Sequence, residues 1–525
     1  MKIDRSALAA IVLLAASFFL GAAAILVTPP FEGADETAHY SYIQQLADTG
    51  HAPVPGKDGL SRDLDRYEGP MRYNDSAPFE ATGKATYRRF RLHPSALTAA
   101  PTHYAPSDTL NWEAQHPPLY YQLMAPIYAM TAWAPFAHGL MVMRFSSWIM
   151  AWAGLALATL ACLCSKETMV RAAAPFIAAW PFLVPQFVPA FARLGNDSYC
   201  LLVVGALFAA LADINQRWRW AGAAALGFLL SQGLQTKAFF LPIGVGLCAF
   251  LVYRGWRDGK TGAGLGEAAI VAAIAALLGG GWYLKSFGVT HDLTSGADFV
   301  ALQKSGGLVA GLERNFSLAA LARGLAALAA TFGWTGTWSL ARPPEALIVF
   351  SLAPFLVALA GYFASLRNQA ASALSASPLF LVAPMLAGLL YHVLVFVALT
   401  GRGASTPGYY LHILAPFLAL AVAIGWDRWR STPWLLVPLG VFTLYAWAMQ
   451  LSMFSGCATK MGDDPHYSFT GAGCVLDAGS LQRLGQPVAA ACAAGLAAGL
   501  LILALAMVRP TRKAGAETSD EPVAW

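Results

Sequence analysis

Two adjacent acids, Asp35 and Glu36, follow the first apolar segment of the chain and a Thr-Pro-Pro break. His39 and Tyr40 lie four residues after these acids, so polar groups recur on the same faces of a predicted helix over 35–49. Acids at a helix N-terminus can also serve as caps, because free amides and the helix dipole stabilise the ionised form. Since the acids form a pair flanked by further polar groups, both are candidate catalytic residues, and Asp35 is the stronger candidate. Glu36 could instead only shape the helix start or hold the acceptor.

Basic residues beside apolar segments are candidate partners for an anion. Lys237 lies between two apolar segments, where a lysine is costly unless it snorkels to the interface or meets an anion. Arginine makes bidentate contacts with phosphate, and Arg342 and Arg402 stand beside later apolar segments. His116, before a Pro-Pro pair, could bind an anion or only cap a helix. These four residues are the predicted ligands of a donor phosphate.

A second polar turn, Asn196-Asp197, lies between two later apolar segments. Asp197 could cap the helix that follows, but an acid at a membrane edge is also typical of a ligand site. The residues predicted to contact an acceptor or a sugar are His39, Tyr40, Tyr120, Asn196, Asp197 and Tyr409.

One carboxylate base and several cations fit one class of reaction. A glycosidase needs a carboxylic acid to protonate its leaving group, whereas a phosphate already leaves as a stable anion. The set therefore favours transfer of a sugar from a lipid-linked phosphate to an acceptor hydroxyl. This chemistry requires no cofactor, and neither a CxxC nor an HExxH spacing indicates a zinc site. A divalent metal bound by Asp35 and Asp197 stays open.

The composition predicts a polytopic membrane protein. Of the 525 residues, 57% are hydrophobic and 12% are charged, whereas about 25% are charged in a soluble protein. Apolar stretches of ~20 residues recur, which predicts an all-α integral membrane protein with about 12 transmembrane helices (about 11–13). The first stretch is longer than the ~7–15-residue core of a cleavable signal peptide, so we expect it to remain as a helix. The predicted spans are 6–27, 144–164, 172–192, 198–214, 220–235, 238–253, 265–287, 345–365, 378–400, 409–425, 432–454 and 486–507.

Basic residues cluster in alternate gaps between these spans, and the positive-inside rule assigns that side to the cytoplasm. The acid pair and the long connections 28–143, 288–344 and 455–485 then lie on the extracytoplasmic face. Within the first connection, 117–135 is predicted to be an interfacial helix on the outer membrane surface, because counting it as a span would invert every later loop.

Seven cysteines are present. Cys457 and Cys474 share the predicted outer loop 455–485 and could form a disulfide in an oxidising compartment. The other five lie in or near predicted spans, where we expect them to be packing residues. The polar tail 509–525 is predicted to be disordered.

An ordered set of motifs resembles the GT-C glycosyltransferases, which include protein O-mannosyltransferases, aminoarabinose transferases and bacterial oligosaccharyltransferases. The motifs, in chain order, are Asp35-Glu36-Thr37-Ala38-His39-Tyr40, His116-Pro117-Pro118-Leu119-Tyr120-Tyr121, Asn196-Asp197 and Thr236-Lys237. The Asp-Glu motif after a first helix is moderately specific, and the ordered set is more so.

The resemblance covers the N-terminal half and implies a division of the chain. A conserved seven-helix module would occupy 1–290, with its active site in the extracytoplasmic loop 28–143. An extracytoplasmic loop over 291–344, variable helices over 345–508 and a cytoplasmic tail over 509–525 would follow.

The resemblance also implies roles for single residues. Asp35 would be the catalytic base, Lys237 would meet the donor phosphate, and Asp197 would lie in the second outer loop, where some members bind metal or acceptor. The Gly-Arg-Tyr sequence that is frequent in the family is replaced here by Gly-Arg402-Gly, with Tyr409 several residues later. Members that use monophosphate donors generally need no metal.

The predicted function is therefore an inverting glycosyltransferase of the bacterial inner membrane, with a polyprenyl-phosphate sugar as donor and its site facing the periplasm or exterior. The acceptor could be a lipid-linked glycan, a lipid or a protein of the cell envelope, including polysaccharide, and no nucleic-acid partner is indicated. Two alternatives stay open: a transporter or flippase of a lipid-linked glycan, and a non-catalytic subunit of an envelope-assembly complex. A transporter predicts acids and broken helices near the bilayer midplane, whereas the charges here gather at the outer edge.

Overall fold

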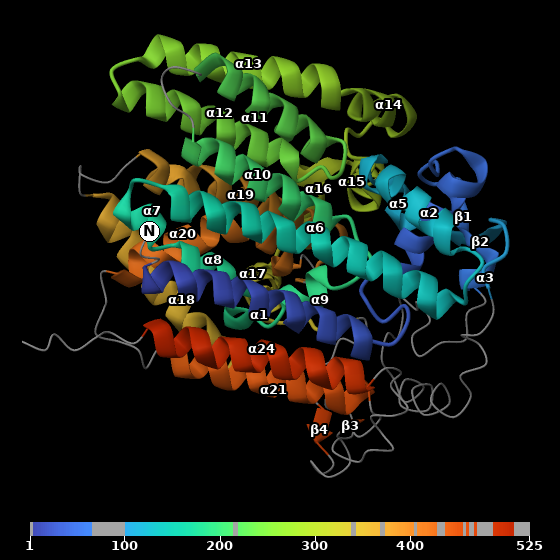
Figure 1. The fold of residues 1–525 in the computed structure, drawn as a ribbon. Coiled ribbons are helices and arrows are strands. Elements are labelled where there is room, and N and C mark those ends of the chain that lie inside the picture. Colours follow the sequence, from blue (N-terminus) through green and yellow to red (C-terminus); the bar gives the residue numbers. More distant parts are fainter. Residues whose placement is uncertain are drawn as a thin grey trace, which may run out of the picture.

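The computed structural model shows a bundle of long helices with a small lobe at one end, formed by α2 (Glu36–Thr49), α3 (Arg62–Asp65), α5 (Leu119–Thr131), β1 (Gly59–Ser61) and β2 (Pro106–Leu110) (Figure 1). Two short two-stranded sheets accompany the helices, and the predicted helical membrane class is confirmed. The residues that the structure describes are 4–65, 100–213, 219–337, 343–367, 373–403, 407–427, 436–454, 458–460, 467–469 and 487–508.

The first half of the chain forms the lobe and the central helices. Its elements are α1 (Arg5–Val27), α2 (Glu36–Thr49), β1 (Gly59–Ser61), α3 (Arg62–Asp65), β2 (Pro106–Leu110), the 3-10 helix η2 (Trp112–Gln115), α5 (Leu119–Thr131), α6 (Phe136–Cys164), α7 (Thr168–Arg171), α8 (Ala174–Leu183), α9 (Phe187–Phe191), α10 (Asp197–Asp213), α11 (Arg219–Leu234), α12 (Phe240–Arg257), α13 (Thr261–Gly279) and α14 (Gly281–Thr290).

The second half of the chain adds further helices around this centre. Its elements are α15 (Ala297–Lys304), α16 (Gly307–Asn315), α17 (Leu318–Gly333), α18 (Glu345–Leu366), α19 (Ala373–Thr400), the 3-10 helix η4 (Gly408–Leu414), α20 (Ala415–Asp427), α21 (Leu436–Phe454), β3 (Ala458–Lys460), β4 (Tyr467–Phe469) and α24 (Pro487–Val508).

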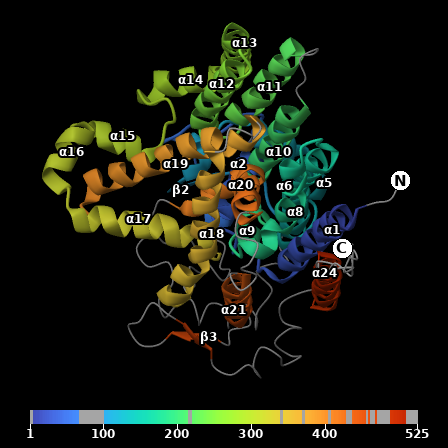
Figure 2. The ribbon, with the colours of Figure 1, turned by 90° about the vertical axis from the view of Figure 1, so that its left-hand side faces the viewer.

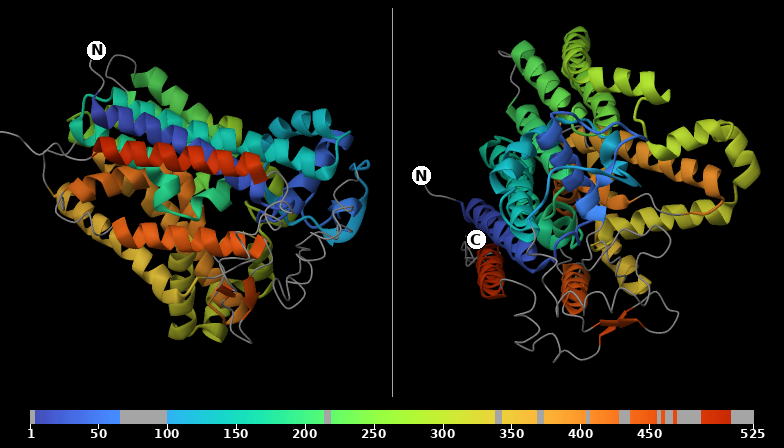
Figure 3. Two further views of the ribbon diagram at one scale, coloured as in Figure 1. Left: turned by 60° about the horizontal axis from the view of Figure 1, so that its bottom comes forward. Right: turned by 90° about the vertical axis from the view of Figure 1, so that its right-hand side faces the viewer.

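Close helix packing in the centre of the bundle depends on glycines. Gly154 of α6 and Gly205 of α10 face each other, and a Cβ atom at either position would meet the backbone of the partner helix. Such small residues let helix backbones approach closely in membrane proteins. Trp148 of α6 lies against Gly21 of α1 and donates its Nε1–H to the carbonyl of Phe18 at 3.1 Å. Helix α6 therefore packs on both α1 and α10, and the C-terminal α24 lies alongside α1 (Figure 3).

The lobe at the end of the bundle is held by aromatic side chains between α2 and α5. The rings of Tyr42 and Tyr121 stack with centroids 3.6 Å apart. Tyr40 meets Phe31 and Tyr128 edge to face, each at 5.6 Å, and all these side chains are buried. The antiparallel pair β1–β2 adds to the same lobe. Aromatic packing thus fixes the positions of α2 and α5, which carry Glu36, His39, Tyr40 and Tyr120 of the candidate site residues.

Among the described residues, six helical segments are long and apolar enough to cross a membrane. These are α1, α6, α13, most of α18, α19 and the segment Gly408–Trp426. The pair α16 and α17 would make a seventh, although the two helices are bent by 111°. The predicted number of about 12 spans therefore stays a prediction.

Some predicted segments have a different form in the structure. The predicted span 172–192 is broken between α8 and α9, where Pro185 supplies no amide hydrogen for a continuing helix. The segment 288–344, expected to be a loop, contains α15, α16 and α17, which project sideways from the bundle (Figure 2). The predicted helices over 35–49 and 117–135 are confirmed as α2 and α5.

Candidate active site

Asp35 stands at a sharp corner between α1 and α2. Its backbone φ of 62° lies in the left-handed region, which Asp and Asn tolerate better than most residues with a side chain. Asp35 occupies the N-cap position of α2, but its side chain makes no cap hydrogen bond. Its carboxylate instead accepts a hydrogen bond from Nε1–H of Trp112 at 2.9 Å. Helix capping therefore does not explain this acid.

The surroundings of Asp35 raise the pKa of its carboxyl group. Burial, and after it the negative charge of Glu113, raise the pKa of Asp35 to about 6. The positive charges of Arg193 and Lys237 and the N–H of Trp112 oppose this shift. A carboxylate whose pKa lies close to the working pH is well suited to accept a proton in catalysis.

Glu36, the second predicted catalytic acid, is buried in an ion pair with Arg144 of α6. Two guanidinium nitrogens donate to its two carboxylate oxygens at 2.7 and 2.5 Å. The backbone amides of Gly33 and Leu194 donate to the same carboxylate at 3.0 and 2.9 Å. Because four donors already occupy its oxygens, Glu36 is suited to hold the surrounding segments together rather than to exchange a proton with a substrate.

Arg144 extends this network to the end of α1. It donates to the carbonyls of Thr28 and Pro29 at 2.7 and 2.8 Å. Arg144 is the first residue of the predicted span 144–164, and no sequence motif assigns it a role. A lone arginine in an apolar helix is the signal that could have revealed it, because such a charge needs a partner in a low-dielectric environment.

Asp197, the first residue of α10, lies between two cations. Its Oδ1 is 2.6 Å from Nζ of Lys237, and its Oδ2 is 3.0 Å from Nη2 of Arg193. Lys237 also lies over the rings of Tyr410 and Phe239, at 4.7 and 4.9 Å from their centroids. All three charged side chains are buried. Two cations facing one carboxylate leave one positive charge in excess.

Arg193 connects the Asp197 group to the corner at Asp35. Its Nη1 donates to the carbonyl of Ala34, the residue before Asp35, and its Nε donates to the carbonyl of Ala190 at 3.0 Å. The structure thus brings the predicted residues Asp35, Asp197 and Lys237 to one place. Arg193 joins them, although the sequence analysis had not selected it.

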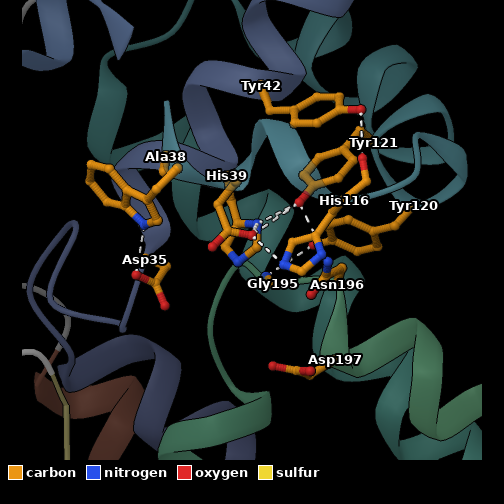
Figure 4. Close-up of polar contacts among 12 residues, drawn as sticks. Asp35, Ala38, His39, Tyr42, His116, Tyr120, Tyr121, Gly195, Asn196 and Asp197 are labelled. Carbon is orange, nitrogen blue, oxygen red and sulfur yellow. Dashed lines mark hydrogen bonds and ion pairs between the residues drawn. The ribbon is translucent and has the colours of Figure 1, made fainter. Parts of the chain in front are cut away.

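A second polar group, which the sequence analysis missed, is centred on Glu113 of η2. Its Oε2 lies 3.2 Å from Nε2 of His116, 3.4 Å from Nδ1 of His39 and 3.4 Å from the hydroxyl of Tyr121. The side chain of Asn111 accepts the amide hydrogen of Glu113 at 2.9 Å and so caps the 3-10 turn. Figure 4 shows His39, His116 and Tyr121 converging between α2 and α5. An acid three residues before a histidine was the local signal for this group.

Burial disfavours the charged forms of both Glu113 and His39, but the neighbouring groups outweigh this effect only at Glu113. For Glu113, burial opposes ionisation, but the interactions with the neighbouring imidazoles of His39 and His116 hold its pKa below the usual range. For His39, burial lowers the pKa to about 4, so the imidazole is neutral near pH 7. Glu113 is therefore an ionised acceptor of hydrogen bonds, and His39 carries a single ring hydrogen.

Two tyrosines selected from the sequence lie within the supporting structure. The hydroxyl of Tyr120 is 2.7 Å from Oγ of Ser147 and accepts the amide hydrogen of Gly195 at 3.1 Å. It therefore supports the turn that carries Asn196. Tyr40 belongs to the aromatic packing of the lobe.

The other predicted residues have different locations. Tyr409 of η4 is buried with its ring centroid 4.6 Å from that of Tyr410, which covers Lys237. Arg402 is exposed just after α19. Arg342, Cys457 and Cys474 lie outside the described residues.

The acids of the site already have partners of their own. Both oxygens of Asp197 face cations, and one oxygen of Asp35 accepts from Trp112. Within the ranges that the structure describes, no group of three or more His, Cys, Asp or Glu residues is arranged to hold a metal ion.

Known proteins resemble this chain only in structure. No protein-family model and no curated protein sequence matches it. Two crystal structures of ArnT from Cupriavidus metallidurans, one bound to undecaprenyl phosphate and one in the apo state, are similar to this chain, with TM-scores of 0.46 and 0.45. In both cases the sequence identity is 13%, and the similarity covers 94% of this chain and 76% of ArnT. The archaeal oligosaccharyltransferase AglB from Archaeoglobus fulgidus, in complex with an inhibitory peptide and a dolichol-phosphate, is similar at 12% identity, over 83% of this chain and 55% of AglB, with a TM-score of 0.39.

Replacing Arg144 by Met should destabilise the protein by roughly 3–5 kcal/mol, because it leaves the Glu36 carboxylate buried without its cation. The double variant Glu36→Gln with Arg144→Met should recover part of this loss. Thermal unfolding of the detergent-solubilised protein measures both effects, with Arg323→Met on the exposed face of α17 as the matched control. If the Arg144 and Arg323 variants unfold at the same temperature, the ion pair does not have this structural role.

Proposed function

We propose that this chain is an inverting membrane glycosyltransferase that moves a sugar from a polyprenyl-phosphate donor to an acceptor hydroxyl. The observation that carries the proposal is the carboxylate of Asp35, which makes no helix-cap bond and lies directly after Ala34, whose carbonyl accepts a hydrogen bond from Arg193 of the Arg193–Asp197–Lys237 group. Displacement of a phosphate by a hydroxyl needs a base beside positive charge, and this arrangement supplies both.

In the proposed reaction, Asp35 accepts the proton of the acceptor hydroxyl while the hydroxyl oxygen attacks the anomeric carbon of the sugar. A bond forms between that oxygen and the anomeric carbon, and the bond from this carbon to the phosphate oxygen breaks. The electron pair of the broken bond leaves with the polyprenyl phosphate. A single displacement from the opposite face inverts the configuration of the anomeric carbon, whereas retention would require a carboxylate nucleophile and a second displacement.

The leaving phosphate would meet Lys237 and Arg193. Together with Asp197 these cations form a group with one positive charge in excess, which supports binding of a phosphate anion. His116, a predicted phosphate ligand, is instead paired with the carboxylate of Glu113, which argues for a role beside the sugar or acceptor. Arg342 and Arg402 stay predicted phosphate ligands.

The remaining residues would support this chemistry in different ways. Glu36 would hold the Asp35 corner in place through Arg144. His39 and Asn196 would face the sugar or the acceptor.

The proposed location is the bacterial inner membrane, with the site on the periplasmic side. The alternation of basic residues along the chain supports this orientation. A lipid-linked donor would remain in the bilayer while its phosphate and sugar reach the polar end of the bundle. The acceptor would be a lipid-linked glycan, a lipid or a protein.

Replacing Asp35 by Asn should lower transfer by roughly 10²–10⁴-fold, because the base is lost. The assay incubates the purified protein with synthetic polyprenyl-phosphate sugars and identifies products by mass spectrometry. Glu313→Gln, on the exposed side of α16, should transfer at the wild-type rate. Full activity of the Asp35 variant would remove Asp35 as base, and translocation without a new glycosidic bond would favour a flippase.

The rate of transfer should depend on pH through Asp35. The base must be ionised, and its pKa is raised to about 6, so kcat/KM should be constant above this pH and fall about tenfold per pH unit below it. Trp112→Phe removes an N–H that stabilises the ionised carboxylate, so the fall should begin at a higher pH. Trp133→Phe, at the exposed end of α5, is the control and should leave the profile unchanged. A fall that begins near pH 4 in the wild type would contradict this assignment.

We expect the transfer to proceed without a divalent metal. Both oxygens of Asp197 already face Lys237 and Arg193, which supports this expectation. These two cations would stabilise the negative charge of the phosphate, as a metal ion does in other enzymes. Activity measured after treatment with EDTA should stay within about twofold of the untreated protein. Loss of activity that added Mg²⁺ or Mn²⁺ restores would show that a metal is needed.

A further inference from the structure

We propose that Glu113 is a positioning residue that, together with Tyr121, holds His39 as its Nδ1–H tautomer, so that the bare Nε2 accepts a hydrogen bond from a substrate hydroxyl. The assignment of the His39 tautomer depends only on the contacts among Glu113, Tyr121 and His39. The part concerning the substrate rests on the proposed glycosyl transfer. No role for Glu113 follows from the sequence motifs.

The tautomer follows from counting donors around the carboxylate. An ionised carboxylate only accepts hydrogen bonds, and Oε2 of Glu113 has His116, His39 and Tyr121 within 3.2–3.4 Å. The hydroxyl of Tyr121 has one hydrogen, which can be donated either to Glu113 or to Nδ1 of His39, 3.0 Å away. The charge-assisted bond to the carboxylate is the stronger one.

The other contacts of Tyr121 agree with this direction. Nδ2 of Asn196 donates to the Tyr121 hydroxyl at 3.5 Å, so this hydroxyl already acts as an acceptor. With its own hydrogen directed to Glu113, the Tyr121 oxygen can also accept from Nδ1–H of His39. Every group in the chain His39–Tyr121–Glu113 then has a complementary partner, which is the arrangement a buried polar network requires.

A neutral imidazole with its hydrogen on Nδ1 has a lone pair on Nε2. Nε2 lies beside Gly195: a Cβ atom placed on this glycine would be 3.5 Å from Nε2 and 3.1 Å from Nη1 of Arg193. The absence of a side chain at Gly195 therefore leaves room next to the lone pair. In Figure 4, His39 lies between Asp35 on one side and the Asn196–Asp197 turn on the other.

A second acceptor lies at the same turn. Oδ1 of Asn196 is buried and has no hydrogen-bond partner among the residues that the structure describes. A buried amide oxygen without a donor is costly, so a ligand that carries hydrogen-bond donors would be favoured here. Two acceptors, Nε2 of His39 and Oδ1 of Asn196, match the hydroxyl groups of a sugar. The hydroxyl could belong to the transferred sugar or to the acceptor.

The tautomer of His39 can be measured by NMR without any substrate. The full-length protein is labelled with ¹⁵N-histidine in detergent micelles, and the ring signals of His39 are identified by their loss in His39→Gln. The wild type should show a protonated Nδ1 and a bare Nε2 from pH 6 to 8. Glu113→Ala should convert the signals to a mixture of both tautomers. A protonated Nε2 in the wild type would overturn the proposal, whether or not the protein transfers sugar.

Two substitutions of His39 test the substrate contact. The amide of glutamine reaches the position of Nε2, whereas the shorter asparagine reaches only that of Nδ1. With the polyprenyl-phosphate sugar that is active in the transfer assay, His39→Asn should raise KM by roughly 3–10-fold, the loss of one hydrogen bond, and His39→Gln should raise it less. A rise confined to the donor KM identifies a hydroxyl of the transferred sugar, and a rise confined to the acceptor KM identifies the acceptor. Equal effects of the two variants on KM would overturn the Nε2 contact.

Two further variants complete the comparison. Gly195→Ala places a methyl group beside Nε2, so it should raise the same KM while the ¹⁵N signals stay those of the wild type. His51→Gln, at an exposed position after α2, is the control and should change neither measurement. If the wild type transfers no sugar, the proposed function fails, and the ¹⁵N spectra still decide the role of Glu113.

Discussion

The buried ion pair between Glu36 and Arg144 is the constraint on which the geometry of the site depends. Removing two charges from water costs several kcal/mol per ion, and this cost is offset only when the remaining donors and acceptors are also satisfied. The pair meets this condition through the carbonyls of Thr28 and Pro29 and through backbone amides near Glu36 and before α10. The end of α1, the start of α2 and the turn before α10 can therefore take only one relative arrangement.

The position of Asp35 is a consequence of this arrangement. It lies directly before Glu36, and the Ala34 carbonyl on its other side accepts from Arg193. Because hydrogen bonds fix both Ala34 and Glu36, the backbone at Asp35 can remain in the left-handed region. The surrounding structure must impose this conformation. Strain of this kind is typical of functional sites, and here it turns a carboxylate away from the helix that it would otherwise cap.

The acids near the site differ in how well they are paired. Glu36 faces one arginine, Asp197 faces two cations, and Glu113 lies beside two imidazoles and accepts from a tyrosine. Asp35 accepts only an indole N–H among the side-chain hydrogen bonds described. The pKa of Asp35 is raised, whereas the groups beside Asp197 and Glu113 lower the pKa values of these two acids, and this difference is the physical basis for proposing Asp35 as the base.

Several features of the site could be predicted from sequence because they are local. The Thr-Pro-Pro break, the acid pair and the amphipathic 35–49 segment are contiguous, so they predicted the helix that became α2. The predicted grouping of Asp35 with Asp197 and Lys237 came from loops assigned to one face by charge. The pairing of Glu113 with His116 had a local signal, but its contact with His39 joins residues that are 74 positions apart in the chain. No local pattern reports a contact across that separation.

The sequence by itself determined the class of the protein, its apolar helices and the short list of polar residues that have to lie near one another. These follow from burial of apolar side chains and from the cost of charges near lipid, both of which depend on residue type and spacing. Only the tertiary structure decided which acid of the pair is held in a buried ion pair. Glu36 and Arg144 are 108 residues apart, and their contact exists only once α2 has packed against α6.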